Sequence, residues 1–99
     1  MAATPMVELL AVHRDAIIAL AERHGVRNVR VFGSFARGEA TETSDVDLLV
    51  STTEHTSPWF PAGLKRDLEQ LLGRRVDVVP EDGLYWLLRR RILRESRPL

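Results

Sequence analysis

The spacing of apolar residues along the chain alternates between the period of a helix and that of a strand. Apolar positions from Leu10 to Leu20 form a helical stripe, which predicts a helix that begins at Thr4-Pro5 and stops at Gly25. Each later apolar stripe of this kind is also bounded by polar or glycine-containing segments. The helical spacing therefore predicts two further helices, one that contains Leu64–Leu72 and is ended by Gly73, and one from about residue 83 to 95.

Three intervening segments have the pattern of β-strands. Residues 28–32 alternate apolar and polar, as a half-buried strand does. Val46–Val50 is almost continuously apolar, which is typical of a strand covered on both faces. A third strand is predicted over Arg74–Val79 and closed by Pro80, while Ser34–Arg37 is predicted to form a short helical turn. The order α-β-α-β-α-β-α predicts an α/β fold, a small mixed β-sheet with helices packed against it.

Length and composition favour one soluble domain. The 99 residues are 44% apolar and 28% charged, so residues 1–99 are expected to form a single domain. The absence of cysteine excludes disulfides and thiolate metal sites. Glu8 and Asp15 interrupt the N-terminal apolar stretch, and no apolar run approaches the about 18 residues of a membrane span. We therefore expect a cytoplasmic protein without a signal peptide or a membrane partner.

The charge balance argues against a free-standing nucleic-acid binder. Fourteen basic residues match fourteen acidic ones, so the formal net charge is zero. Proteins that bind nucleic acid by themselves usually carry a basic surplus that neutralises phosphates. Direct binding of nucleic acid by this chain is therefore not expected.

Two aspartates stand at the mouth of the most apolar predicted strand. Asp45 and Asp47 flank a single valine, so their side chains point to the same face of a strand. Asp77 lies between two valines of the third predicted strand, and it faces the same side if the two strands pair. Like charges this close raise each other's pKa unless a cation lies between them. Mg²⁺ prefers such oxygen ligands, and three carboxylates on one sheet face suit a two-metal phosphoryl-transfer site.

Residues suited to binding an anion precede the aspartates. Gly33 tolerates a positive φ and lets the backbone approach a phosphate closely. Ser34 offers a hydroxyl and a backbone N–H at the start of a predicted helical turn. Arg37, one turn later, has a forked guanidinium that suits phosphate oxygens. Metal ligands on one side and a phosphate cradle on the other predict a nucleoside triphosphate as the ligand.

Each of these residues also has an interpretation without a ligand. Gly33-Ser34 alone is a strand-to-helix turn with a serine cap, and Asp45 alone is a loop acid at a strand entrance. Asp77 alone is equally well explained by an ion pair with an arginine at 30, 74 or 75. Only the joint occurrence of these residues favours a functional site.

Two further clusters have open interpretations. Trp59-Phe60 and Tyr85-Trp86 either close a small core or form a patch for a partner. Arginines at 89, 90, 91 and 94 crowd the last predicted helix. A solvated helix end is the default explanation for them, and an acidic partner surface or RNA is the alternative.

The spacing of the motifs resembles that of a known superfamily. "GS", ten further residues and then "DVD" are similar to the signature of the DNA polymerase β-like nucleotidyltransferases. More narrowly, "GSFARGEATETSDVDLLV" with the later "GRRVDVV" resembles the minimal nucleotidyltransferase (MNT) group, whose members are often antitoxins encoded beside HEPN-type toxins. The resemblance covers essentially the whole chain and implies the polymerase β-like palm fold.

The resemblance also implies a role for each matching residue. Gly33 and Ser34 would bind the triphosphate, and Arg37 would contact its phosphates. ATP is the implied co-substrate, together with Mg²⁺, as two ions. The implied catalytic and metal-binding residues are Asp45, Asp47 and Asp77.

The implied reaction is attack of an acceptor hydroxyl on the α-phosphate of ATP, with Asp77 assisting deprotonation and pyrophosphate leaving. Because the chain is barely longer than a catalytic unit, we expect the acceptor to be a separate protein. In the MNT group this would be a HEPN-type RNase toxin, silenced by AMPylation of a tyrosine. Two other hypotheses remain open: a non-catalytic antitoxin that masks the toxin, and a transferase for RNA or a small molecule that works with a separate subunit.

Overall fold

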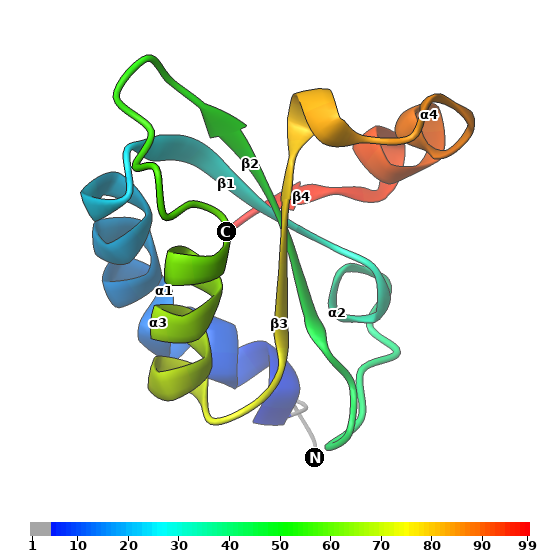
Figure 1. Cartoon of the computed structure of the whole chain (residues 1–99). Helices are drawn as coiled ribbons and strands as arrows, with labels where there is room; N and C mark the ends of the chain where they lie inside the picture. The colour runs from blue at the N-terminus through cyan, green and yellow to red at the C-terminus, as the bar shows by residue number, and fades with distance from the viewer. Residues whose placement is uncertain (1–4) are drawn as a thin grey trace.

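The computed structural model describes residues 5–99 and contains a four-stranded mixed sheet (Figure 1). Its strands are β1 (Val26–Phe32), β2 (Val46–Thr52), β3 (Val76–Pro80) and β4 (Arg97–Pro98). They lie in the order β3-β2-β1-β4. β2 runs parallel to β3, while β1 runs antiparallel to both of its neighbours.

Helices cover the two faces of this sheet unequally (Figure 1). α1 (Pro5–Arg23) and α3 (Ala62–Leu72) pack on each other and against one face. The four-residue α2 (Ser34–Arg37) follows β1 after one glycine. On the other side, the 3-10 turn η1 (Glu81–Gly83) leads to α4 (Trp86–Glu95), which stands apart from α1 and α3. The expected small α/β fold is confirmed, and in the described part of the chain no helix is long and apolar enough to cross a membrane.

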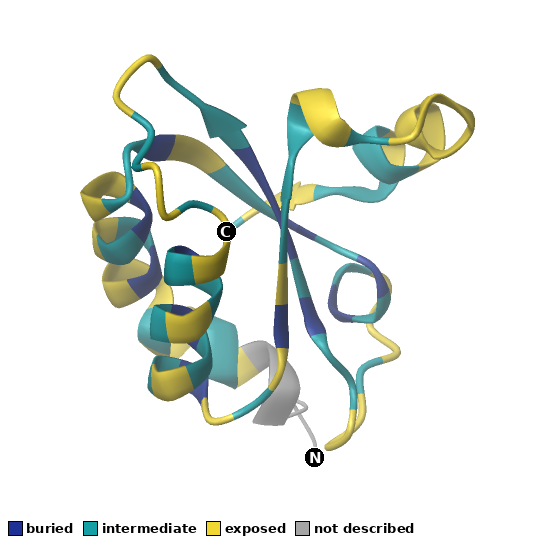
Figure 2. Ribbon diagram, in the orientation of Figure 1, coloured by how far each residue is buried: buried dark blue, intermediate teal, exposed yellow. Residues whose placement is uncertain are grey.

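The hydrophobic core lies between the sheet and the pair α1 and α3 (Figure 2). Val31 of β1 is paired with Leu48 of β2, and both side chains point into this core. Ile17 of α1 and Leu64 and Leu68 of α3 close it from the helical side. Each such side chain contributes roughly 1.5–3 kcal/mol when it is removed from water. The helical spacing of leucines therefore identified the buried face of α3 correctly.

β2 is covered on both faces, as its continuous apolar sequence predicts. Leu48 and Val50 point into the core, while Leu49, on the opposite face, is also only 1% exposed. Asp47 shares the face of Leu49, because side chains alternate along a strand. A carboxylate therefore lies at the beginning of an otherwise apolar strand face.

The first two strands are longer than predicted. β1 begins at Val26, because a bulge around Asn28, whose φ is 57°, interrupts the apolar alternation without ending the pairing. β2 continues to Thr52, which pairs with Val26 of β1. β3 begins only at Val76, so the two preceding arginines belong to the connection after α3.

The two ends of the chain differ more from the prediction. Thr4, the predicted N-cap, lies outside the described residues. The last helix begins at Trp86, because the preceding segment forms η1 and then an extended residue, Tyr85. β4 was not predicted, since two residues are too few to carry a periodic pattern and only their pairing with β1 defines them.

The two aromatic pairs do not close the core as a whole. Phe60 is partly buried and packs against the core cluster. Trp59, Tyr85 and Trp86 are all largely exposed. The interpretation of these aromatics as core residues is therefore wrong for three of the four.

Leu68→Ala tests the position of the core. Leu68 is 1% exposed, so its truncation leaves a cavity and we expect the free energy of unfolding to fall by about 2–5 kcal/mol. Leu87→Ala removes the same atoms from a side chain that is 58% exposed, and we expect a loss below about 0.5 kcal/mol. Urea denaturation measures both values, and equal losses would contradict the assigned core.

Candidate active site

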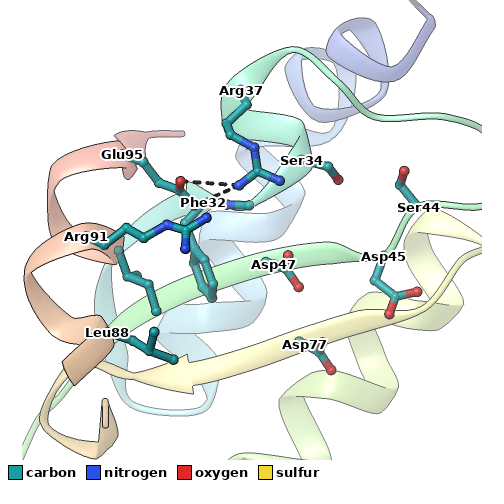
Figure 3. Close-up of a pocket in the computed structure, with 12 residues that line it drawn as sticks. Phe32, Ser34, Arg37, Ser44, Asp45, Asp47, Asp77, Leu88, Arg91 and Glu95 are labelled. Carbon is teal, nitrogen blue, oxygen red and sulfur yellow. Dashed lines mark hydrogen bonds and ion pairs between the residues drawn. The ribbon is translucent and has the colours of Figure 1, made fainter. Parts of the chain in front are cut away.

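Parallel pairing of β2 with β3 brings two of the predicted aspartates together. Asp47 is the direct partner of Asp77 in the register of these strands, so both side chains lie on one face of the sheet (Figure 3). Asp45 lies immediately before β2 and lines the same pocket. The sequence-based condition that the second and third strands pair is therefore met.

The carboxylates create a site that is short of positive charge. Partial burial, followed by repulsion from Asp77, a hydrogen bond with it and repulsion from Asp45, raises the pKa of Asp47 from 3.8 to about 6. The positive charge of Arg37 lowers the pKa of Asp47, but by less than any of these interactions raises it. A cation bound between these oxygens would remove the repulsion.

The backbone at Gly33 packs directly against this carboxylate. Its φ is 74°, in the region that favours glycine. A Cβ atom at position 33 would collide with the Asp47 oxygen Oδ2. Glycine is therefore required here for both conformation and space, and any side chain would displace Asp47 from its place beside Asp77.

Ser34 begins the short helix α2 and faces the same pocket (Figure 3). The interpretation of this residue as a serine cap is therefore not supported, because the preceding residue, Gly33, occupies the cap position.

Glu95, at the end of α4, accepts hydrogen bonds from groups that the sequence analysis assigned to phosphate binding. The Gly33 N–H donates to Glu95 Oε2 at 2.7 Å. Arg37 Nη1 donates to Glu95 Oε1 at 3.2 Å and to Oε2 at 3.3 Å, while Arg37 Nε donates to Glu39 at 2.9 Å. An internal carboxylate thus holds both the backbone and the side-chain donor (Figure 3). Sequence reasoning missed this contact, since it joins residues about sixty positions apart in the chain and no local pattern reports it.

The ion pair proposed as an alternative role for Asp77 is not formed. Among residues 5–99, Arg30 pairs instead with Glu81 at 4.0 Å. Arg74 donates to the carbonyl oxygen of Ser44 at 3.2 Å and lies over an aromatic ring of α2. None of the three candidate arginines therefore neutralises Asp77 in the described structure.

All six residues predicted from the sequence line one pocket, between the carboxylates and α4 (Figure 3). The other lining residues come mainly from the end of β1 and from α4. They give the pocket an apolar wall, a serine and two charged groups. These residues, not predicted from the sequence, are Phe32, Ser44, Leu88, Arg91, Ile92 and Glu95.

The three aspartates are suitable ligands for a hard cation, although they do not converge. Within residues 5–99 no group of three or more acidic, histidine or cysteine side chains is close enough to hold a metal ion by itself. Mg²⁺ usually takes only one or two protein carboxylates and completes its octahedron with water and substrate phosphates. An all-oxygen set, in which the pKa of Asp47 is raised, lies in the same pocket as Gly33 and Ser34 and therefore fits a cation that binds together with a nucleotide. The assignment of metal ligands stays a prediction.

Comparison with known proteins identifies the class. The model of the nucleotidyltransferase domain family matches residues 14–99, and the chain belongs to this family. The expectations of a minimal nucleotidyltransferase and of an enzyme of this class are confirmed.

Individual relatives are similar over most of their length. A protein adenylyltransferase, MntA of Thermococcus cleftensis, is 49% identical over 77% of each chain. A candidate protein adenylyltransferase of Methanocaldococcus jannaschii, MJ0435, is 44% identical over 81% of this chain and 86% of its own. A solved structure of a candidate minimal nucleotidyltransferase has a TM-score of 0.83 and 53% identity, covering 94% of this chain and 95% of that one. A toxin–antitoxin structure solved with AMP-PNP shares the fold, with a TM-score of 0.73 at 21% identity, over 85% of this chain and 69% of that one.

The raised pKa of Asp47 predicts a pH-dependent penalty on stability. Between about pH 6 and 3.8 the folded chain binds a proton at Asp47 that the unfolded chain does not, so this group raises the free energy of unfolding as the pH falls. Asp47→Asn carries no charge at any pH. We expect this variant to be more stable than the unaltered chain at pH 8 and to lose that advantage by pH 4.

Urea denaturation at three pH values, in EDTA to exclude divalent cations, measures the effect. Asp15→Asn is the matched control, because the Asp15 side chain is 99% exposed and lies far from the pocket on α1. A stability difference between Asp47→Asn and the unaltered chain that is the same at all three pH values would contradict the assigned repulsion.

Proposed function

We propose that this chain is a Mg²⁺-dependent protein adenylyltransferase that acts as an antitoxin. It transfers AMP from ATP to a tyrosine hydroxyl of a partner HEPN-type RNase toxin. The observation that carries the proposal is the shared pocket of three aspartates and the Gly33-Ser34 turn in a nucleotidyltransferase domain. The name of the Thermococcus relative supports a protein acceptor, and the toxin–antitoxin neighbours support a toxin partner.

The pocket divides the work between its two sides. The Gly33 N–H, the Ser34 hydroxyl and Arg37 would hold the triphosphate, and Asp45, Asp47 and Asp77 would hold the metal ions. When bound, Mg²⁺ supplies positive charge that lowers the pKa of the attacking hydroxyl and stabilises the leaving group.

The proposed transfer is a single displacement at phosphorus. The acceptor oxygen forms a bond to the α-phosphorus of ATP, and the bond from that phosphorus to the oxygen bridging to the β-phosphate breaks. The acceptor proton passes to the carboxylate side of the site, where Asp77 is exposed and forms no ion pair among the described residues. AMP remains on the acceptor as a phosphodiester, and pyrophosphate leaves. Because the reaction consumes ATP, we place it in the cytoplasm.

Label transfer from α-³²P-ATP tests this proposal directly. This chain, Mg²⁺ and the purified product of the gene encoded beside it are combined, with the Asp45→Asn/Asp47→Asn double variant run in parallel. We expect label on the partner protein, loss of at least about 10³-fold of the rate in the double variant, and no transfer in EDTA. Phosphodiesterase treatment and mass spectrometry identify the modified residue.

Two outcomes would contradict the proposal. A double variant that binds and silences the partner as well as the unaltered chain, without any label, indicates a masking antitoxin. Label that enters RNA or a small molecule, with none on protein, indicates a different acceptor class. Glu42→Gln, an exposed acid in the loop before the site, controls for the loss of loop charge.

Glu95→Gln tests whether the internal carboxylate competes with the nucleotide. Because Glu95 holds the Gly33 N–H and Arg37, removal of its charge frees two phosphate donors. We expect ATP with Mg²⁺ to bind about tenfold more tightly to this variant, as measured by calorimetry without acceptor. Glu39→Gln is the matched control, since Glu39 pairs with Arg37 and has no contact with Gly33. Weaker binding to Glu95→Gln would mean that Glu95 positions these donors instead of blocking them.

A further inference from the structure

α4 is a helix that the rest of the described chain does not cover. None of its residues is buried, although Trp86 and Leu87 begin it and Leu88 follows. Trp86 is 73% exposed and Leu88 is 46% exposed. A ten-residue helix is marginal in water without packing on an apolar face. In Figure 2 much of the α4 ribbon is yellow and none of it is dark blue, whereas α1 and α3 carry dark blue segments.

Polar contacts hold α4 at its two ends. At the C-terminal end of α4, Glu95 accepts hydrogen bonds from the Gly33 N–H and from Arg37. Near its beginning, Arg89 donates to the carbonyl oxygen of Glu81 at 2.9 Å and pairs with its carboxylate at 3.6 Å. The helix is thereby fixed in orientation while its apolar first turn faces outward. Such an arrangement suits a surface that is completed by a partner.

Apolar and basic residues occupy different parts of the exposed side of α4. Trp86, Arg90 and Arg94 follow one another at i, i+4 and i+8, and so form one stripe along the helix. Leu87 and Arg91 form the neighbouring stripe. Each stripe is apolar at the beginning of the helix and basic toward its end. Within residues 5–99 the three arginines at 90, 91 and 94 form no ion pair, in contrast to Arg89.

This surface continues into the candidate active site. Leu88 and Arg91 belong both to α4's exposed side and to the pocket lined by Asp47 and Asp77 (Figure 3). A protein that covers α4 therefore also covers the open side of the pocket. Among the described residues, large exposed apolar side chains outside α4, such as Trp59 and Val12, do not line that pocket.

We propose that this face of α4 is the docking surface for the acceptor protein. We define the α4 surface as Trp86, Leu87, Leu88, Arg90, Arg91 and Arg94. It fits a partner whose matching face is an apolar hollow bordered by acidic side chains. This proposal rests on the proposed function, which makes the docked protein the acceptor of AMP. Docking here brings a hydroxyl of that partner to the mouth of the pocket.

The charge of the α4 surface favours an acidic protein over other occupants. In a two-fold dimer of this chain the same surface would meet itself, so the unpaired arginines of both copies would share one interface to which the α4 surface contributes no acidic residue, which is unfavourable. A nucleic acid would match the arginines, but the chain as a whole has no basic surplus. The large apolar side chains of the first turn match a protein hollow, in which aromatic and arginine residues typically contribute most of the binding energy.

The experiment compares binding and transfer in the same set of variants. Trp86→Ser and Arg90→Glu/Arg94→Glu alter the α4 surface at residues that do not line the pocket. Trp59→Ser and Arg23→Glu/Arg66→Glu are the matched controls. Trp59 is 76% exposed in the connection before α3, and Arg23 of α1 and Arg66 of α3 are exposed and do not line the pocket. The probe is the purified protein encoded beside this chain. Calorimetry measures its binding, and label from α-³²P-ATP measures transfer to it.

Binding weakened by at least about tenfold in both α4 variants and unchanged in both controls supports the proposal. In the transfer assay the same variants are expected to raise KM for the partner and to leave the affinity for ATP unchanged. Dependence of binding on Trp86 in a complex that transfers no label overturns the proposed function while supporting the docking surface. Transfer and binding that are equal in all variants overturn the docking surface while leaving the proposed function intact.

Other occupants give distinct results, each of which overturns the proposal. A dimer of this chain that Trp86→Ser dissociates in sedimentation assigns the surface to a second copy. A single-stranded RNA oligonucleotide whose binding is lost with the two arginines assigns it to nucleic acid. A wild-type chain that stays monomeric and binds neither the partner protein nor RNA shows that the surface has none of these roles.

Discussion

The parallel, in-register pairing of β2 with β3 is the constraint on which the site depends. It sets Asp47 directly beside Asp77, and no arginine of the described chain neutralises the latter. Burial of Asp47 and repulsion between these two carboxylates both raise the pKa of Asp47. The pairing persists because the opposite face of the same strands is buried, with Leu48 and Val50 in the core. The energy of a conventional apolar core thus holds together a charge arrangement that is unfavourable by itself.

The turn after β1 depends on the same carboxylates through sterics. Gly33 lies so close to Asp47 that a side chain at position 33 would collide with it. Its positive φ turns the backbone N–H toward the pocket, where Glu95 accepts it. An anion therefore already sits against the donors of the turn. The donors that we propose for phosphate thus already surround a negative charge, which an internal acid provides.

The two faces of the sheet differ in their chemistry and in how much they contribute to stability. One face carries α1 and α3 and nearly all of the buried apolar residues. The other carries the acidic pocket and α4, which is attached mostly by polar contacts at its ends. Stability concentrated on one face leaves the other free to expose charged and aromatic groups. This division is typical of proteins whose function requires a destabilised surface.

The sequence by itself determined the elements and the participants of the site. Helical and strand periods reveal local burial, so the helices and the three main strands were predictable. The motifs "GS", "DVD" and the later "VDVV", together with Arg37, identified six of the twelve residues that line the pocket. Only the tertiary structure decided how these parts meet. The register that joins Asp47 to Asp77, the two-residue β4, and the contact of Glu95 with Gly33 each join distant segments. Local patterns carry no information about such contacts, because the free energy that selects them comes from packing the whole chain at once.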